Sequence, residues 1–159
     1  MSFLTPKLSA LAIGFVFFHN CLPGIEPIGQ WRFDSTTLRG ESLNSTIGPW
    51  TGKVQGTASL TKDKPSSLEA SKGFKAIILS EDLAKAGLPS KEISVTTWVR
   101  IDKVIEWGGL LGAIQDNGSF ERGWLLGYGK DSFYFAIASE SKRKLTYLKT
   151  TLPYSPGYW

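Results

Sequence analysis

The chain has 159 residues, which is long enough for one domain with a hydrophobic core. The chain contains 17 glycines, 6 Trp, 5 Tyr and 9 Phe, and glycines for turns with aromatics for strands indicate an all-β domain. Charged residues make up 20% of the chain, which excludes a disordered chain by composition. The formal net charge of +4 is too small to indicate a nucleic-acid-binding protein.

Residues 1–22 are typical of a secretory signal peptide. Lys7 supplies a positive start, and residues 8–18 are an apolar run too short to cross a bilayer. The alternative is a buried N-terminal helix or strand. Cys21 and His19 are the only cysteine and histidine, so no zinc spacing exists. Removal of the signal at or after Cys21 leaves a domain with no His and no Cys, which excludes Ser-His-Asp, Cys-His and His-metal chemistry.

The first half of the predicted domain contains short strands and one helix. Strands are expected over 28–34 and 50–60, and a hairpin-like pair over 67–70 and 74–79, with polar loops or turns over 35–48 and 61–67. A helix is expected over residues 80–87. Ser80 suits its N-cap, acidic residues occupy its first turn, and Gly87 suits its end.

The clearest strand pattern spans residues 92–102, EISVTTWVRID. Alternation places one set of side chains on one face of the strand: Ile93, Val95, Thr97, Val99 and Ile101. Trp98 and Arg100 lie on the other face, either as a polar recognition strip or with the arginine stem packed on the aromatic ring.

Four further strands follow at regular spacing, over residues 107–114, 120–128, 132–139 and 144–150. Asn117-Gly118 marks a turn between the first two. The basic run Lys142-Arg143-Lys144 is interpreted as a solvated hairpin tip, because a nucleic-acid-binding face needs a wider basic footprint. Regular strands of this kind are typical of a sandwich or jelly roll.

Four segments in this order resemble the laminin G-like / concanavalin A-like lectin family. They are IGQWRFD at 28–34, EISVTTWVRID at 92–102, the glycine-bearing and aromatic strands of 110–138, and PGYW at 156–159. The resemblance implies a two-sheet antiparallel sandwich, a concanavalin A-like jelly roll, over residues 28–159.

The family pattern continues with further strands beyond the position of Trp159. The resemblance therefore implies a sandwich incomplete at its C-terminus, belonging to a longer product or a truncated one, and poorly soluble alone. The segment from Trp98 to Gly127 resembles versions attached to bacterial secreted metallophosphoesterases or other hydrolases. That likeness is one of fold and says nothing about activity in these residues.

Two kinds of site are expected from the resemblance and the residues. Asp116 and Asn117 are candidate Ca²⁺ ligands, which Glu121 and Asp131 approach, although turn chemistry also explains them. Exposed aromatics with polar neighbours would bind sugar. The candidate platforms are Trp107, Trp124, Tyr128 and Tyr134, and the candidate polar partners are Arg122, Gln115, Asp116 and Asn117. The alternative is that these aromatics fill the core.

The carboxylates of the domain indicate that it is not an enzyme. Glycosidase chemistry needs two carboxylates close together on a strand, whereas those from Glu92 to Glu140 are spread about ten residues apart. The sequence therefore predicts a secreted, periplasmic or cell-surface non-catalytic module that binds an extracellular glycan or protein and no nucleic acid. The alternatives are a structural accessory domain of a larger hydrolase and an inactive fragment.

Overall fold

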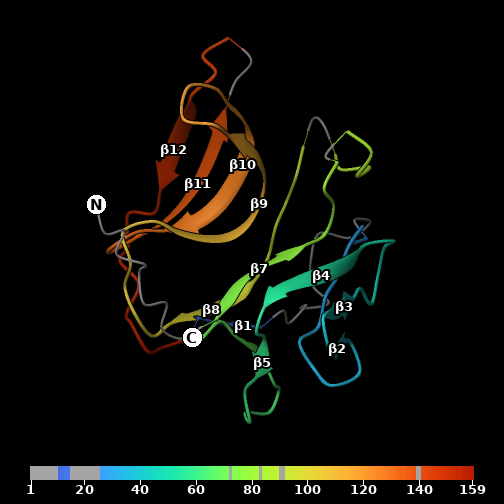
Figure 1. Ribbon diagram of the computed structural model, residues 1–159. Helices are drawn as coiled ribbons and strands as arrows, with labels where there is room; N and C mark the ends of the chain where they lie inside the picture. The colour runs from blue at the N-terminus through green and yellow to red at the C-terminus, as the bar shows by residue number, and fades with distance from the viewer. Residues whose placement is uncertain (1–10, 15–25, 72, 83, 90–91, 139–140) are drawn as a thin grey trace, which may run out of the picture. The chain divides into compact units, whose positions relative to one another are not determined.

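The computed structural model describes residues 11–14, 26–71, 73–82, 84–89, 92–138 and 141–159, the first of these ranges by its backbone alone (Figure 1). These residues form strands and no helix, so the all-β prediction is confirmed. The strands make three antiparallel sheets of four strands each. No helix of the described residues is therefore long and apolar enough to cross a membrane.

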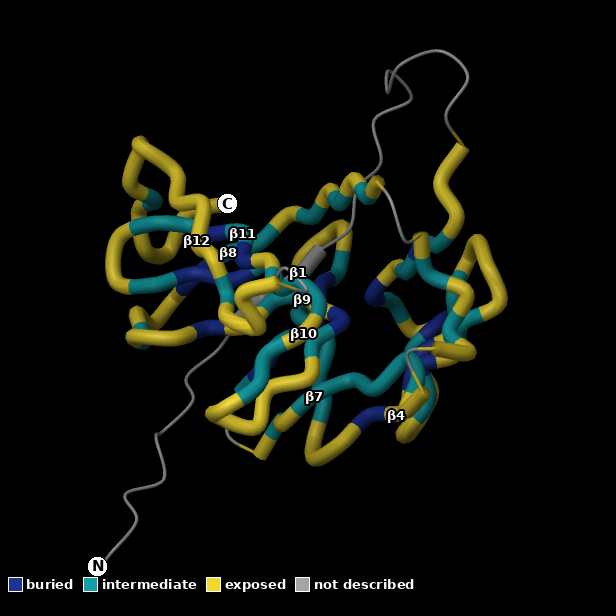
Figure 2. Tube along the Cα trace, turned by 90° about the horizontal axis from the view of Figure 1, so that it is seen from above, coloured by how far each residue is buried: buried dark blue, intermediate teal, exposed yellow. Residues whose placement is uncertain are grey.

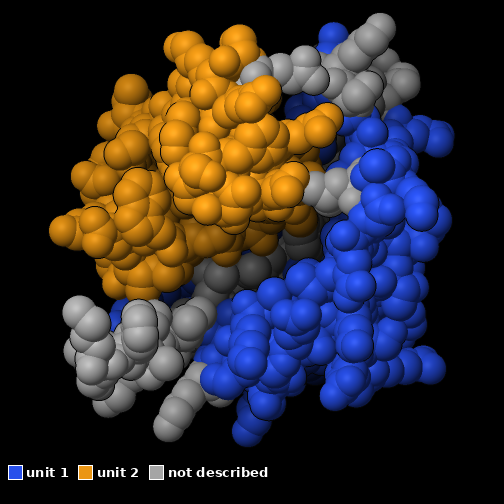
Figure 3. Space-filling view, turned by 45° about the horizontal axis from the view of Figure 1, so that its top comes forward, with its two compact units in different colours: residues 1–103, 157–159 blue, residues 104–156 orange. Residues whose placement is uncertain are grey.

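The chain divides into two compact units, residues 1–103 with 157–159 and residues 104–156 (Figure 3). The first unit contains two sheets. One has the order β5 (Ser59–Leu60), β6 (Leu68–Glu69), β1 (Leu11–Gly14) and β8 (Trp98–Ile101). The other has the order β2 (Leu38–Arg39), β3 (Ser42–Asn44), β4 (Thr51–Gly56) and β7 (Phe74–Ile78).

The second unit contains one sheet in which neighbours in sequence are neighbours in space (Figure 1). Its strands are β9 (Gly108–Asp116), β10 (Glu121–Tyr128), β11 (Phe133–Ala138) and β12 (Leu145–Lys149). These confirm the four strands predicted after residue 106, with ends that differ by at most two residues from the expected ones. The basic run lies between β11 and β12, as expected of a hairpin tip.

The core of the first unit is built around Phe33, Leu43 and Leu68, which are buried. Partly buried apolar side chains pack against these three: Trp31, Leu38, Ala58, Leu60, Phe74 and Ile77. In β4, buried Gly52 and Val54 alternate with exposed neighbours, and Figure 2 shows such alternation along the chain. Period-two burial of this kind is what a strand with one core-facing side requires.

The strand predicted over residues 28–34 is wrong. This segment makes a single bridge, between Gln30 and Ile47, and belongs to no sheet. Side chains fix it instead: Phe33 enters the core, and the Trp31 indole donates to the carbonyl of Trp50 at 3.3 Å. The segment is therefore held by its side chains, while its backbone has no partner strand.

The strand predicted over residues 92–102 is confirmed only for Trp98–Ile101. The expected faces are nevertheless visible in the burial of the whole described segment. Ile93, Val95 and Thr97 are half-buried, the residues between them are exposed, and Ile101 is buried. Arg100 packs over the ring of Trp159 at 5.4 Å and forms an ion pair with Asp102 at 2.8 Å.

The helix predicted over residues 80–87 is wrong, because the described residues there form turns. The Ser80 hydroxyl accepts the amide of Asp82 at 3.2 Å, and Asp82 Oδ1 accepts the amides of Ala84 and Lys85 at 3.0 and 3.3 Å. Such local bonds compete with helix formation, and eight residues are too few to nucleate a stable helix without packing.

The pairing expected for residues 67–79 is also wrong. β6 pairs with β1 and β5, whereas β7 pairs with β4 in the other sheet. The single strand expected over 50–60 is divided between β4 and β5, which belong to different sheets. Most of the predicted signal peptide lies outside the described residues. Its residues 11–14 form β1, between β6 and β8.

The buried leucines of the core predict a clear stability effect. Leu68 is 1% exposed, so Leu68→Ala should lower the free energy of unfolding by about 2–5 kcal/mol through lost burial and a cavity. Ile28→Ala is the matched control, since Ile28 is 54% exposed and should change stability by less than about 0.5 kcal/mol. Urea unfolding measures both, and equal effects would contradict this description of the core.

The turn that begins at Asp34 predicts that the stability of the protein depends on pH. Asp34 Oδ1 accepts the amides of Thr36 and Thr37 at 2.8 and 3.1 Å and the Thr36 hydroxyl at 2.5 Å. The Thr36 hydroxyl, above all, holds the pKa of Asp34 below its usual 3.8. This stabilisation is present above pH 3.8 and is lost as pH falls through the lower pKa of the folded state.

Asp34→Ala should therefore destabilise the protein at pH 7 by about 1 kcal/mol, as loss of a capping side chain does. The difference in urea midpoint between the variant and the parent chain should shrink once the pH falls below the pKa of folded Asp34. A difference that stays constant through that range would show that the carboxylate charge is not involved.

Candidate functional site

One face of the sheet in the second unit carries glycines in place of large side chains. Directly opposed residues of antiparallel strands share a face. Gly127 is opposed by Gly109 on β9 and by Tyr134 on β11, and the next pair along β10 and β11 is Leu125 with Ala136. Tyr147 on β12 is opposed to Ala136, so Tyr147 lies on the same face as Tyr134. We call this face the aromatic face.

The glycine at 127 determines how the Tyr134 ring lies. A Cβ at Gly127 would come within 2.5 Å of the ring and hydroxyl of Tyr134 and of the Gly108 carbonyl oxygen. The ring therefore lies directly over the bare backbone, and its hydroxyl donates to the Gly108 carbonyl at 3.3 Å. Tyr134 is buried in this position.

Three aromatic rings meet on this face. The ring centroids of Trp107 and Tyr134 are 6.2 Å apart, those of Trp107 and Tyr147 are 5.7 Å apart, and those of Tyr134 and Tyr147 are 5.4 Å apart. Trp107 is 61% exposed and Tyr147 is 39% exposed, whereas Tyr134 supports them from below. We call these three residues the aromatic cluster; it presents ring surface to solvent on a fixed base.

The other predicted sugar-binding residues lie on the opposite face of the same sheet. Arg122, Trp124 and Tyr128 alternate along β10 with the residues of the aromatic face. Trp124 stacks on Phe135 with centroids 6.0 Å apart, and buried Tyr128 lies over Gly108. The structure therefore separates Trp107 from the three residues with which it was grouped.

Tyr147 is a member of the cluster that sequence reasoning missed. Its strand was expected, but its neighbours depend on the register between β11 and β12, which pairs it with Ala136. Trp107 reaches the cluster beside a register shift at Leu126 and Gly127. Neither register has a local signal in the sequence, since a shift of one residue exchanges the two faces of a strand.

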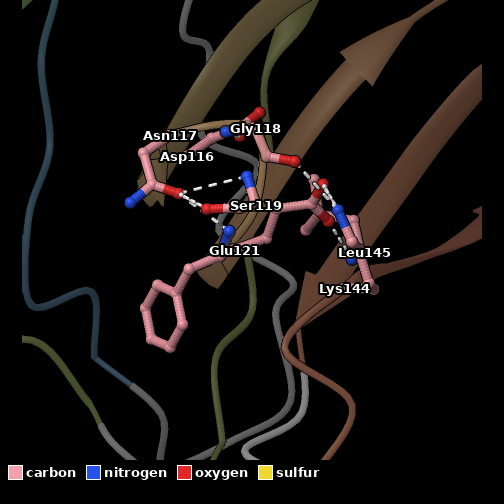
Figure 4. A network of polar contacts seen from close by, with 8 residues as sticks. Asp116, Asn117, Gly118, Ser119, Glu121, Lys144 and Leu145 are labelled. Carbon is pink, nitrogen blue, oxygen red and sulfur yellow. Dashed lines mark hydrogen bonds and ion pairs between the residues drawn. The ribbon is translucent and has the colours of Figure 1, made fainter.

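The loop between β9 and β10 holds the residues expected to bind calcium (Figure 4). Asp116 Oδ1 accepts the amide of Gly118 at 2.8 Å. Asn117 Oδ1 accepts the amides of Ser119 and Phe120 at 3.2 and 2.7 Å. These are the local bonds by which Asp and Asn stabilise turns.

Within the described ranges, no group of three or more His, Cys, Asp or Glu side chains is arranged to hold a metal ion. The amide oxygen of Asn117 and one carboxylate oxygen of Asp116 are occupied by turn amides. The calcium site at Asp116 and Asn117 therefore stays a prediction, and its ligands would have to give up or share these bonds.

Glu121 joins this loop to the basic tip between β11 and β12 (Figure 4). Its Oε2 accepts the backbone amide of Leu145, and its Oε1 lies 3.5 Å from Lys144 Nζ. Lys144 also donates to the Gly118 carbonyl at 3.0 Å, and Arg143 lies over the Phe120 ring at 5.5 Å. Two of the three basic side chains thus pack against the neighbouring turn.

The two tyrosines of the cluster are neutral at physiological pH. Burial, followed by the negative charges of Glu121 and Asp116, raises the pKa of Tyr147 above its usual 10.0. Burial, followed by the proximity of Tyr147, raises the pKa of Tyr134. Both hydroxyls therefore remain hydrogen-bond donors.

Comparison of the chain with models of known families, with curated proteins and with solved structures finds no match. The candidate site is accordingly defined by its own geometry, an exposed aromatic cluster on a glycine-bearing sheet face with a polar loop at one end.

The role of Gly127 can be tested with a matched pair of substitutions. Gly127→Ala should displace the Tyr134 ring or shift the strand, and should lower the free energy of unfolding by about 1–3 kcal/mol. Gly109→Ala is the control, because its Cβ would meet only Leu125, at an ordinary 3.7 Å. Near-ultraviolet circular dichroism reports the packing of the rings, and identical spectra for both variants would contradict the proposed support.

Proposed function

We propose that the protein is a secreted, non-catalytic module that binds an extracellular glycan on its aromatic cluster. The observation that carries the proposal is the exposure of Trp107 and Tyr147 on a ring base fixed by buried Tyr134. Large aromatic side chains are normally buried or partnered, so an exposed, supported group of them marks a binding surface.

The chemistry around the rings suits a sugar. A pyranose ring has an apolar C–H face that packs on an aromatic ring and hydroxyls at its edge that need polar partners. Lys149, which is opposed to Tyr134 on β12, supplies a donor on this face. Asp116, which is exposed at the far end of the face, supplies an acceptor.

We further propose that the sheets belong to a laminin G-like / concanavalin A-like sandwich. The antiparallel, all-β character of the described residues supports this fold, as do the succession of β9, β10 and β11 and the sequence segments that resemble the family. Binding modules of several classes use such a sheet, so the fold supports a binding function without naming the ligand.

A glycan array tests the proposed function. The full chain should bind a subset of glycans, and Trp107→Ala should weaken binding of these by at least about tenfold, as loss of a central aromatic anchor does. Leu148→Ala is the matched control, because Leu148 is 64% exposed and follows Tyr147 on the opposite face of β12. Equal losses in the two variants, or undiminished binding by Trp107→Ala, would contradict the proposal.

Export with removal of residues 1–22 predicts a change in the first unit. Cleavage would remove β1, whose backbone pairs with both β6 and β8. The mass of the exported product should show an N-terminus after residue 22, and the amides of β6 and β8 should exchange hydrogen faster than in the uncleaved chain. An exported product that retains β1 would contradict removal of the signal, and unchanged exchange would contradict the pairing.

A further inference from the structure

We propose that the turn between β9 and β10 modifies itself: Asn117 loses ammonia and becomes aspartate or isoaspartate, with the backbone nitrogen of Gly118 as the attacking group. An asparagine followed by glycine permits this reaction, because no Cβ shields the nitrogen that attacks. Both residues are exposed. Gly118 has a φ of +82°, and a Cβ built on it would meet no atom within 4 Å. The turn therefore leaves room for a cyclic product and for water.

The attacking nitrogen has a proton acceptor beside it. The Gly118 amide donates to Asp116 Oδ1 at 2.8 Å (Figure 4). This distance is within the range over which a side chain takes a proton from a reacting group. The amide hydrogen becomes more acidic as the nitrogen bonds to carbon, so Asp116 is placed to act as the general base of the reaction.

The side-chain carbonyl under attack has three donors on its oxygen. Asn117 Oδ1 accepts the amide of Ser119 at 3.2 Å, the amide of Phe120 at 2.7 Å and the Ser119 hydroxyl at 3.2 Å. Donors directed at a carbonyl oxygen stabilise the negative charge that this oxygen gains during attack. The turn thus places a base at the nucleophile and donors at the electrophile of one Asn-Gly pair.

The reaction exchanges water for ammonia. A bond forms between the Gly118 nitrogen and Cγ of Asn117, and the bond between Cγ and Nδ2 breaks. Nδ2 leaves as ammonia with the proton that Asp116 took from the Gly118 amide. The product is a cyclic imide, which water opens at either of its carbonyls to give aspartate or isoaspartate at position 117. No oxidant, reductant or further reactant is needed.

The two products have different effects on the turn. The Asn117 amide donates to the Phe120 carbonyl at 3.3 Å, and Lys144 donates to the Gly118 carbonyl at 3.0 Å. Isoaspartate inserts a methylene into the backbone between these two bonds, whereas aspartate adds a negative charge and keeps the backbone. The isoaspartate form should therefore loosen the link between this turn and the basic tip that carries Lys144.

The experiment incubates the full chain at neutral pH and body temperature. Peptide mass spectrometry with fragmentation measures the replacement of amide by acid at Asn117 and at Asn44. Asn44 is the internal control, because it is also exposed but is followed by Ser45, whose side chain shields the attacking nitrogen. Asn117 should convert at least about tenfold faster than Asn44. Equal or slower conversion of Asn117 overturns the proposal.

Asp116→Ser tests the base, since a serine hydroxyl also accepts a turn amide but lacks the carboxylate. It should slow the conversion of Asn117 by about threefold or more, because proton removal loses its acceptor. Near-ultraviolet circular dichroism should match that of the parent chain, which shows that the turn and the rings near it are retained. An unchanged or faster conversion would show that the bond to Asp116 shields the Gly118 nitrogen, and this overturns the role assigned to Asp116.

Discussion

The missing side chain at Gly127 is the constraint on which the candidate site depends. It lets the ring of Tyr134 lie on the backbone of the sheet, where any Cβ would come within 2.5 Å of it. Tyr134 in turn meets Trp107 and Tyr147 edge-on at centroid distances of 6.2 and 5.4 Å, so the two exposed rings have a buried ring as their base. Preorganised aromatic surface of this kind binds at a low cost in conformational entropy.

The two faces of this sheet both carry aromatic side chains, but these side chains have different roles on each face. Trp124, Phe135 and Tyr128 form the apolar face, where stacking and burial stabilise the unit. The aromatic face has small residues on β10 and β11, such as Gly127 and Ala136, and its rings therefore stand over backbone and not among other large side chains. At its end, Glu121 ties two turns together, which leaves Asp116 as the carboxylate open to solvent.

The sequence predicted the strands of the second unit well, because alternation between residues 120 and 128 and an Asn-Gly turn are local signals. It predicted Trp107 and Tyr134 as candidates and missed Tyr147. The cluster depends on the strand register and on the register shift between Leu126 and Gly127, which are tertiary properties. In the first unit, burial of residues 92–101 was predictable while pairing was not. The expected helix at 80–87 was lost to the side-chain bonds of Ser80 and Asp82.

The most direct measurement of the central claim is a map of aromatic side-chain resonances during titration with a bound glycan. A ligand on the aromatic cluster should shift the signals of Trp107 and Tyr147 and leave those of Trp124 and Tyr128 nearly unchanged, since the latter lie on the other face. Shifts concentrated at Trp124 and Tyr128, with Trp107 unaffected, would contradict the account and place the binding surface on the apolar face.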